Sequence, residues 1–363
     1  MDAWMKRAWL RLHLTPGLGR KSIFRLIETY GSPEDALQAP AADWCQRCGI
    51  RADVAAGRPA NDDSRLEKIL ERLEQLQVDL LTYWDDHNYP PLLRQIPDPP
   101  ALLYLRGRLP DQEMFAIVGS RRASARGLAF TEEIAGELAA CGICIVSGLA
   151  RGIDTAAHRG ALATGTTVAV LGCGIDRVYP PENTRLFHQI ESRGALLSEY
   201  APGTPPLAGH FPGRNRLISG LARGVLIVEA AKGSGSLHTA EFALETGREV
   251  FAVPNPVGQA TGDGVNQLLK DGARVVTESR DILEVLWRGR LAGRQVQTGE
   301  TATANLSEQE RNMLKLLSFD PVHGDEIIRK SGLTPPEVSD ILLHLELAGL
   351  VVQQPGGYYV RSC

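Results

Sequence analysis

The chain alternates short apolar runs with amphipathic stretches, most regularly between Met114 and Pro254. Runs that are apolar at nearly every position are typical of strands buried on both faces of a sheet. They predict strands over 115–118, 143–147, 167–171, 195–199, 224–229 and 249–253. Helical spacing between them predicts helices over 128–140, 154–163, 183–192 and 239–246. The pattern predicts an α/β domain whose mostly parallel sheet is covered by helices on both faces.

The residues before this core predict a helix, two strands and a small helical domain. Apolar residues recur at helical spacing over 64–77, and 78–84 has the composition of a strand. The proline-rich stretch 86–105 predicts an extended connector that ends in another strand. The chain is thereby divided into a helical domain (1–62), an α/β domain (63–287, core 114–254), a linker (288–305) and a C-terminal domain (306–363).

Within the first domain, the turn Pro16–Gly19 precedes a helix start that carries Arg20 and Lys21. This arrangement resembles one helix-hairpin-helix unit, in which glycine amides and basic side chains meet a phosphate. A second, degenerate hairpin would lie at Trp44–Ile50. A small helical domain with tight turns and no DNA contact explains the same residues equally well.

The C-terminal residues predict a winged helix. Ser307 with Glu310, and Thr334 with Glu337, have the spacing of capping boxes that open helices. The helices are expected over 307–319, 325–330 and 335–348, followed by a hairpin over 351–360 that turns at 355–357. No Lys or Arg occurs from Thr334 to Leu350, whereas three acidic residues do. Since acidic groups repel phosphates, the pattern indicates contact with protein instead of DNA.

Composition limits the classes of function. The 363 residues carry a net charge of -4, so nucleic-acid binding would have to come from local patches. No apolar run approaches the roughly 18 residues of a membrane span, and the first residues do not resemble a signal peptide. We therefore expect no membrane association and a cytoplasmic location.

Metal, cofactor and catalytic patterns are weak. The pairs Cys45/Cys48 and Cys141/Cys144 have zinc-ligand spacing, but Cys144 falls in a predicted buried strand. Neither a G-x-G-x-x-G after the first strand nor a phosphate-binding P-loop is present. Ser147, Asp154 and His158 lack the elbow motif of a hydrolytic nucleophile. We expect no metal, no cofactor and no catalytic triad.

Two arginine-rich stretches, both interpreted as turns, are the strongest chemical signal. One is Gly119–Arg122, directly after the first core strand; the other is Phe211–Arg216. No Asp or Glu occurs between Met114 and Thr131 or between Tyr200 and Val228. These two acid-free windows hold Arg121, Arg122, Arg126, Arg214, Arg216 and Arg223. Arginine binds phosphate and stacks on bases, and Phe211 supplies a stacking face, so the pattern predicts one anion-binding surface for a single strand. Structural arginines paired with carboxylates are the alternative, which the two acid-free windows disfavour.

The small-residue stretch Gly233–Glu241 is a further candidate. Exposed amides at a helix start would bind phosphate. Tight strand–helix packing is an equally good interpretation of it.

Several motifs resemble one family. V-G-S-R (118–121), S-G-L-A-R-G-I-D-T-A-A-H (147–158), F-P-x-R-N-R-L-I-S-G-L (211–221) and G-R-E-V-F-A-V-P (247–254) are similar to motifs of the DprA/Smf family of natural transformation. The resemblance implies an extended Rossmann-like fold, preceded by a helical domain of the SAM or helix-hairpin-helix kind and followed by a winged helix. It implies single-stranded DNA binding, a homodimer through the central domain, loading of the RecA recombinase, and no enzymatic activity.

Carried over by motif, the DNA contacts fall on Gly119, Ser120, Arg121, Phe211, Arg214, Asn215 and Arg216. The alternative class is a nucleotide-processing hydrolase similar to the lysine-decarboxylase-like phosphoribohydrolases. Those enzymes need a P-G-G-x-G-T turn, and this chain has S-G-S-L-H-T from Ser234. A pure protein scaffold is the other alternative, and oligonucleotide binding at low salt would distinguish it.

Overall fold

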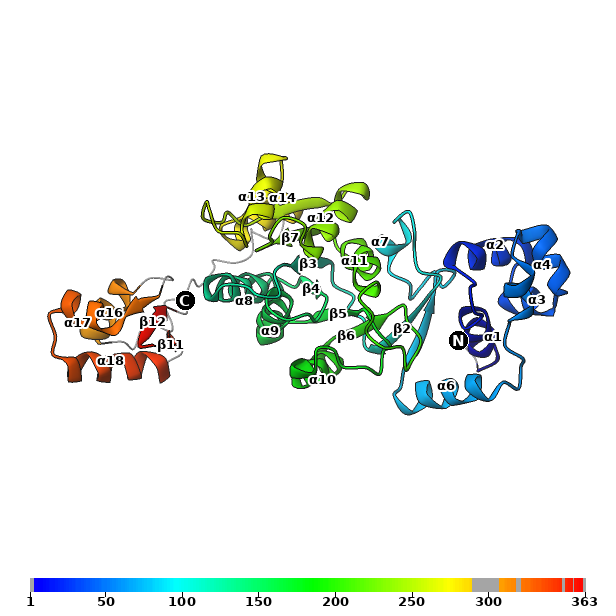
Figure 1. The fold of residues 1–363 in the computed structure, drawn as a ribbon, viewed down its shortest axis with the longest axis horizontal. Coiled ribbons are helices and arrows are strands. Elements are labelled where there is room, and N and C mark those ends of the chain that lie inside the picture. Colours follow the sequence, from blue (N-terminus) through cyan, green and yellow to red (C-terminus); the bar gives the residue numbers. More distant parts are fainter. Residues whose placement is uncertain (1–2, 289–306, 318–320, 348–349, 355, 362–363) are drawn as a thin grey trace.

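A nine-stranded sheet forms the centre of the computed structural model, which describes residues 3–288, 307–317, 321–347, 350–354 and 356–361 (Figure 1). Its strand order is β1-β2-β6-β5-β4-β3-β7-β8-β9. The strands are β1 (Asp79–Thr82), β2 (Leu102–Gly107), β3 (Met114–Val118), β4 (Cys144–Ser147), β5 (Thr167–Leu171), β6 (Ala195–Ser198), β7 (Gly224–Ile227), β8 (Glu249–Ala252) and β9 (Arg274–Val275). Strands β3 to β9 pair in parallel, whereas β2 runs antiparallel to both of its neighbours.

The order in which the chain visits these strands creates a switch point. From β3 the chain proceeds through β4, β5 and β6 on one side, and then returns to place β7 against the other side of β3. Ligands of such sheets bind beyond the carboxyl ends of the strands at the position where the order reverses. In this sheet that position is the carboxyl end of β3 and β7, directly before Gly119.

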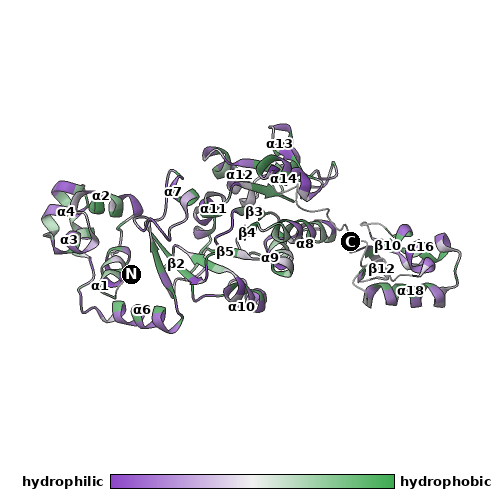
Figure 2. Ribbon diagram, turned by 180° about the vertical axis from the view of Figure 1, so that it is seen from behind, coloured by the Kyte–Doolittle hydropathy of each residue, from purple (hydrophilic) through white to green (hydrophobic). Residues whose placement is uncertain are grey.

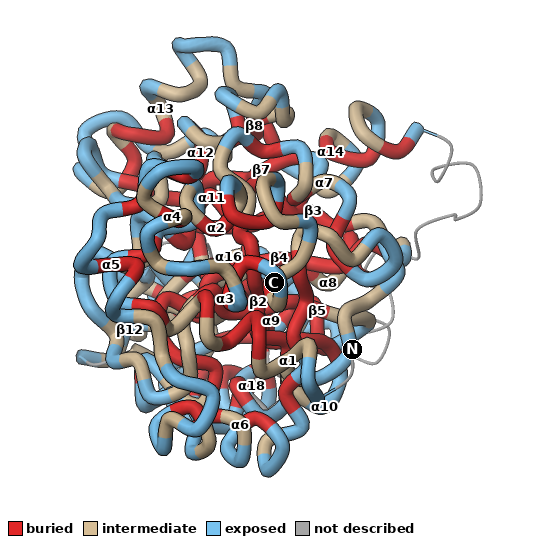
Figure 3. Tube along the Cα trace, turned by 90° about the vertical axis from the view of Figure 1, so that its right-hand side faces the viewer, coloured by how far each residue is buried: buried red, intermediate tan, exposed pale blue. Residues whose placement is uncertain are grey.

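Helices cover both faces of the sheet, as the apolar runs predicted. They are α7 (Pro91–Arg94), α8 (Ala125–Ala140), α9 (Ile153–Thr164), the 3₁₀ turn η1 (Pro181–Asn183), α10 (Thr184–Arg193), α11 (His210–Leu221), α12 (Gly235–Glu245), α13 (Asp263–Lys270) and α14 (Ser279–Leu286). Helices α8, α9 and α14 pack on one face of β3, β4, β7 and β8, and α11, α12 and α13 pack on the other. The strands are the most apolar part of the chain (Figure 2) and lie at its buried centre (Figure 3).

The N-terminal helices share a hydrophobic core with one end of the sheet. They are α1 (Ala3–His13), α2 (Arg20–Tyr30), α3 (Pro33–Gln38), α4 (Ala41–Cys48), α5 (Ala52–Ala56) and α6 (Ser64–Gln75). Their apolar residues form one cluster with those of β1, β2 and α10. Trp9 stacks on Trp84 at 5.0 Å between ring centroids, and His13 Nδ1 lies 3.0 Å from the Tyr104 hydroxyl. The first helices are therefore packed directly on the sheet.

The C-terminal residues form the winged helix that the capping boxes predicted. It contains α16 (Glu308–Leu316), β10 (Val322–His323), α17 (Gly324–Ser331), α18 (Pro335–Leu347), β11 (Val351–Gln354) and β12 (Tyr358–Arg361), with a hydrophobic core of its own. Ser307 and Glu310 exchange both bonds of a capping box, and Glu337 accepts from Thr334. The predicted linker from 289 onward, and the helix ends at Phe319 and Ala348, lie outside the described residues.

Two predictions of secondary structure were wrong, and two helices were not predicted. The largest error is Phe211–Arg216, predicted as a turn, which lies inside helix α11. Pro212 and Gly213 suggested a turn, but proline is tolerated in the first turn of a helix, where its missing N–H has no intrahelical acceptor. The stretch 86–105, predicted as extended, contains the short helix α7. Helices α13 and α14, which follow the core, were not predicted.

Candidate nucleic-acid interface

Three loops and the start of α11 meet at the carboxyl edge of the sheet. The loops follow β3, β4 and β5, and glycines bring them into contact. A Cβ at Gly119 would lie 2.7 Å from Cγ1 of Ile153, and a Cβ at Gly172 would lie 2.8 Å from Cδ1 of Phe211. Gly152 has a φ of 71° and packs against the Ser120 carbonyl. Because side chains would clash here, the loops require glycine for their close approach.

The exposed part of this edge is centred on Arg121 and Phe211. Arg121 is exposed, and its guanidinium carbon lies 5.3 Å from the centroid of the half-buried Phe211 ring. The Tyr179 ring lies 5.6 Å from Phe211, and Tyr179 is 39% exposed. Among the described residues, no carboxylate forms an ion pair with Arg121. The edge therefore offers one unneutralised guanidinium beside two aromatic rings.

Arg214 lies beneath this surface and does not form part of it. Only 4% of the residue is exposed, and Nη1 donates hydrogen bonds to the carbonyls of Gly148, at 2.8 Å, and Val170. Burial lowers the pKa of Arg214, and the nearby charge of Asp154 opposes that shift. A Cβ at Gly148 would lie 2.7 Å from the guanidinium carbon. Arg214 thus joins the loop after β4 to strand β5 from the inside.

Arg216 is also buried, with two carboxylates beside it. It is 6% exposed, Nη2 donates to Glu199 at 2.7 Å, and Nε lies 3.6 Å from Asp98. The prediction that the acid-free windows present exposed, unpaired arginines is therefore wrong for Arg214 and Arg216. An acid-free window in the sequence does not keep carboxylates of other elements away in space.

Arg223 occupies the opposite edge of the sheet. It lies just before β7, and its Nε pairs with Glu113, the residue before β3, at 2.7 Å. The prediction that all six arginines of the two windows form one surface was wrong for Arg223 as well. Arg122 and Arg126 are exposed in the loop after β3 and at the start of α8.

Asn215 connects α11 to the small-residue stretch before α12. Its Nδ2 donates to the Gly235 carbonyl at 2.9 Å, and Ser234 caps the helix by accepting from Ser236 N. Both sequence interpretations of Gly233–Glu241 remain compatible with this geometry, since the stretch packs against α11 and also opens a helix.

Ser147, Asp154 and His158 form other contacts than those of a catalytic triad. The Ser147 hydroxyl donates to the Ile117 carbonyl, and Asp154 accepts from the amides of Gly148 and Ala150. Burial, together with the charge of Arg214, lowers the pKa of His158 to about 3. Burial raises the pKa of Asp154, against the charge of Arg214. These side chains hold the loop after β4 in place.

None of the described cysteines, Cys45, Cys48, Cys141, Cys144 and Cys173, forms a disulfide, and burial raises the pKa of Cys144 to about 12. Within the described ranges, no three His, Cys, Asp or Glu side chains are grouped so that they could hold a metal ion. No helix of the described residues is both long enough and apolar enough to cross a membrane.

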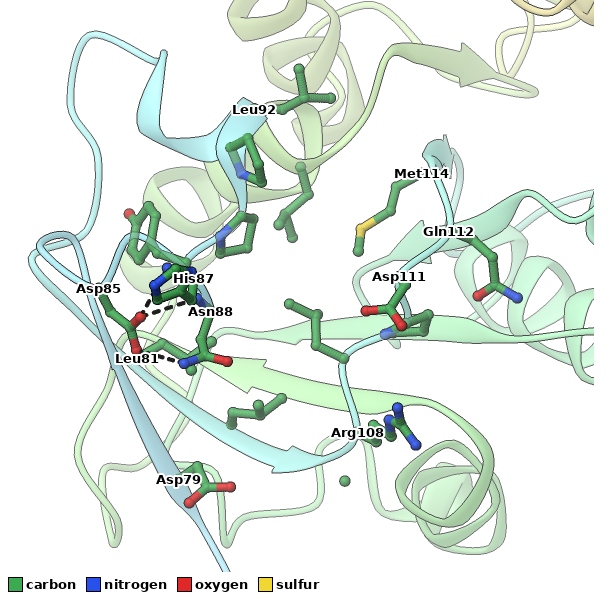
Figure 4. A pocket seen from close by; sticks show the side chains of 18 of the residues that line it. Asp79, Leu81, Asp85, His87, Asn88, Leu92, Arg108, Asp111, Gln112 and Met114 are labelled. Atoms are coloured by element: carbon green, nitrogen blue, oxygen red, sulfur yellow. Dashed lines mark hydrogen bonds between the residues drawn. The ribbon is translucent and has the colours of Figure 1, made fainter. Parts of the chain in front are cut away.

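A wide cavity of about 790 Å³ lies at the opposite, amino edge of the sheet (Figure 4). The turn Asp85–Asn88 faces it on one side and Asp111–Met114 on the other. Its charged side chains are Lys6, Asp79, Asp85, Arg108, Asp111, Glu113 and Arg223. Because both signs of charge are mixed there, the cavity does not have the character of an anion-binding groove.

Sequence reasoning missed Tyr179, Glu199 and Tyr200. Tyr179 lies in the loop after β5. Tyr200 stacks on His210 at 4.1 Å between ring centroids, and its hydroxyl donates to the His210 carbonyl at 3.2 Å. The available signal was the position of Glu199 at the end of a predicted strand and of Tyr200 directly after it.

The sequence matches two known family profiles. Residues 80–287 match the family described as DNA recombination-mediator protein A, and residues 297–357 match the DprA winged helix domain. The chain is 38% identical over 330 residues to Protein Smf of Synechocystis sp., covering 81% of this chain and 83% of the relative. It is 42% identical over 283 residues to Protein Smf of Escherichia coli, covering 76% and 75%.

Solved structures give the same result. The X-ray structure of DNA processing protein A from Streptococcus pneumoniae matches with a TM-score of 0.68 and 39% identity, over 77% of this chain and 97% of that one. A structure describing the single-stranded DNA binding mode of DNA processing protein A from Helicobacter pylori matches with a TM-score of 0.54 and 32% identity, over 59% and 97%. These matches do not favour the nucleotide-processing hydrolase.

Proposed function

Because this chain belongs to the DprA/Smf family of DNA processing proteins, we propose that it binds single-stranded DNA at the carboxyl edge of its sheet. The Arg121 guanidinium 5.3 Å from the Phe211 ring is the observation that carries this proposal. An arginine without an ion pair can bind a phosphate, and an aromatic ring that is partly exposed can stack on a base. The Helicobacter pylori relative, described by its single-stranded DNA binding mode, supports the same ligand.

The seven residues predicted from the motifs then take two roles. Gly119, Ser120, Arg121 and Phe211 lie at the surface and would contact the strand. The buried Arg214 and Arg216 would hold the surface from within, through Gly148 and Glu199, and the half-buried Asn215 would hold it through Gly235. Ser147, Asp154 and His158 are engaged in supporting the loop after β4, so the proposal includes no catalytic step.

The family also supports a wider role. We propose that the chain protects single strands, loads the RecA recombinase onto them during transformation, acts in the cytoplasm, and forms a homodimer through its central domain. Family membership supports these four points.

Titration of labelled single-stranded and duplex oligonucleotides at several salt concentrations tests the site. Losing one phosphate contact lowers the slope of log K against log salt by roughly 0.7 for single strands. We expect Arg121→Ala to weaken single-strand binding and to lower that slope. Arg223→Ala is the matched control, because Arg223 pairs with Glu113 at the other edge of the sheet.

Equal affinities of wild type, Arg121→Ala and Arg223→Ala would reject this site. A loss that is larger for Arg223→Ala would place the strand at the amino edge of the sheet. Tighter binding of duplex than of single strand would reject the proposed ligand.

A further inference from the structure

The N-terminal helical domain reaches the proposed DNA-binding helix through a cluster of four charges. Arg20, at the start of α2, donates through Nε to Asp98 at 3.2 Å and through Nη1 to Glu199 at 3.3 Å. Arg216 of α11 donates to Glu199 from the other side. The side chains of Glu199 and Arg216 are 10% and 7% exposed, whereas that of Arg20 is 41% exposed. Two arginines from different domains thus share the same two carboxylates.

Arg216 depends on where these carboxylates lie. Its Nη2 forms its hydrogen bonds to Glu199, whereas its buried Nε and Nη1 have no hydrogen-bond acceptor among the described residues. The distance from Nε to Asp98 is 3.6 Å, which is an ion pair beyond hydrogen-bond length. A buried arginine with few acceptors is stabilised only while its carboxylates remain in place. Arg20 holds both of them.

The segment Glu199–Tyr200 also contacts the first turn of α11. Tyr200, next to Glu199, stacks on His210 and donates to its carbonyl. His210 immediately precedes Phe211, whose ring lies beside Arg121. A displacement of Glu199 and Tyr200 would therefore reach the aromatic ring of the proposed site through two contacts.

We propose that Arg20 is a positioning residue for the DNA site, and that the N-terminal domain sets the placement of α11 through the cluster of Arg20, Asp98, Glu199 and Arg216. This inference rests on the proposed function. It gives Arg20 a different role from the phosphate contact that a helix-hairpin-helix unit would assign to it. The Nε, Nη1 and Nη2 groups of Arg20 all donate to carboxylates within the fold, which leaves its guanidinium neutralised.

Binding measurements on the full chain separate the two roles. We expect Arg20→Ala to weaken single-strand binding by about three- to tenfold, within the range of couplings that ion-pair networks carry. The salt slope should stay at the wild-type value, because no phosphate contact is lost. Arg20→Lys keeps one charge but cannot bridge both carboxylates. Its affinity for single strands should lie between that of the wild type and that of Arg20→Ala. A lower slope for Arg20→Ala would overturn the inference, since Arg20 would then contact the DNA itself.

Arg7→Ala is the matched control. Arg7 pairs with Glu67 and so joins α1 to α6, away from α11. We expect it to leave affinity unchanged. Equal losses for Arg7→Ala and Arg20→Ala would show a general effect of loosening the N-terminal domain, and would contradict a specific role for Arg20.

Two further readouts keep the inference distinct from the proposed function. When Phe211 has already been replaced by alanine, Arg20→Ala should lower the affinity for single-stranded DNA by less than about twofold. The effects of two residues that act through one contact are not additive. Independent losses in the double variant would contradict the inference. Hydrogen exchange needs no DNA: Arg20→Ala should increase the exchange of α11 amides, and Arg7→Ala should not. Unchanged exchange would overturn the positioning role even if DNA binding were confirmed. A protein that bound no DNA but showed the increased exchange would refute the proposed function and leave only the placement of α11 by Arg20.

Discussion

Replacing Arg214 by methionine distinguishes a structural arginine from one that binds DNA. The substitution removes the charge but keeps an unbranched apolar side chain of similar length. It removes the donor to the carbonyls of Gly148 and Val170, and it takes away the positive charge beside the buried Asp154. Hydrogen bonds from charged groups contribute about 1.5–3 kcal/mol each, and breaking a buried charge pair costs about 3–5 kcal/mol. Because methionine restores some apolar packing, we expect Arg214→Met to lower the free energy of unfolding by about 3 kcal/mol.

The loss should depend on pH. Burial raises the pKa of Asp154 above its usual value of 3.8, so the folded state binds this proton more tightly than the unfolded state. Stability from this group therefore falls as the pH rises from about 4 through the folded pKa. Without the charge of Arg214, the pKa of Asp154 in the folded state rises further. The loss of stability from this group then continues to higher pH. The cost of Arg214→Met should thus be larger at pH 8 than at pH 5.

Thermal and urea unfolding at both pH values provide the measurement. About 3 kcal/mol corresponds to a fall of about 6–12 °C in the melting temperature of a domain of this size. The control is Arg274→Met, which breaks the pair with Glu249 at 2.9 Å, where the two side chains are 52% and 43% exposed. Its effect should stay within about 1 kcal/mol at either pH. Stability like that of the control, combined with weaker DNA binding and a lower salt slope, would refute the buried role of Arg214.

Two further predictions concern the site and the C-terminal domain. Gly172→Ala would place a Cβ 2.8 Å from Cδ1 of Phe211, so we expect the substitution to displace the Phe211 ring. Single-strand binding should weaken severalfold, with an unchanged salt slope. An affinity equal to that of the wild type would count against Phe211 as the stacking face. The winged-helix fragment 306–363 has its own hydrophobic core, and we expect that it does not bind duplex DNA tightly in a gel-shift assay. The reason is that Glu337, Asp340 and Glu346 are exposed on α18 and repel phosphates. Tight binding would overturn that interpretation.

Much of the fold followed from periodicity alone. The six core strands were located because parallel strands buried on both faces are apolar at almost every position, which few other elements are. The winged helix was located because Ser307 and Thr334 lie three residues before a glutamate at a helix start. Helix α11 was missed because its buried residues, Arg214 and Arg216 among them, are not all apolar. A charged side chain on the buried face of a helix interrupts the regular spacing of apolar residues by which an amphipathic helix is recognised in a sequence.

The candidate site could be located from the sequence, but its internal contacts could not. The glycines and Arg121 follow a predicted strand, and parallel strands bring their carboxyl ends to one edge, so this surface could be inferred. Which arginine faces solvent depends on residues remote in sequence: Glu199 lies 17 residues from Arg216, and Arg20 lies 179 from Glu199. Local composition reports the charges of a segment but not those of the elements packed against it. An arginine within an acid-free segment is thus available for the proposed DNA contact only if no carboxylate of another element forms an ion pair with it. Among the described residues, Arg216 pairs with Glu199, whereas Arg121 has no such ion pair.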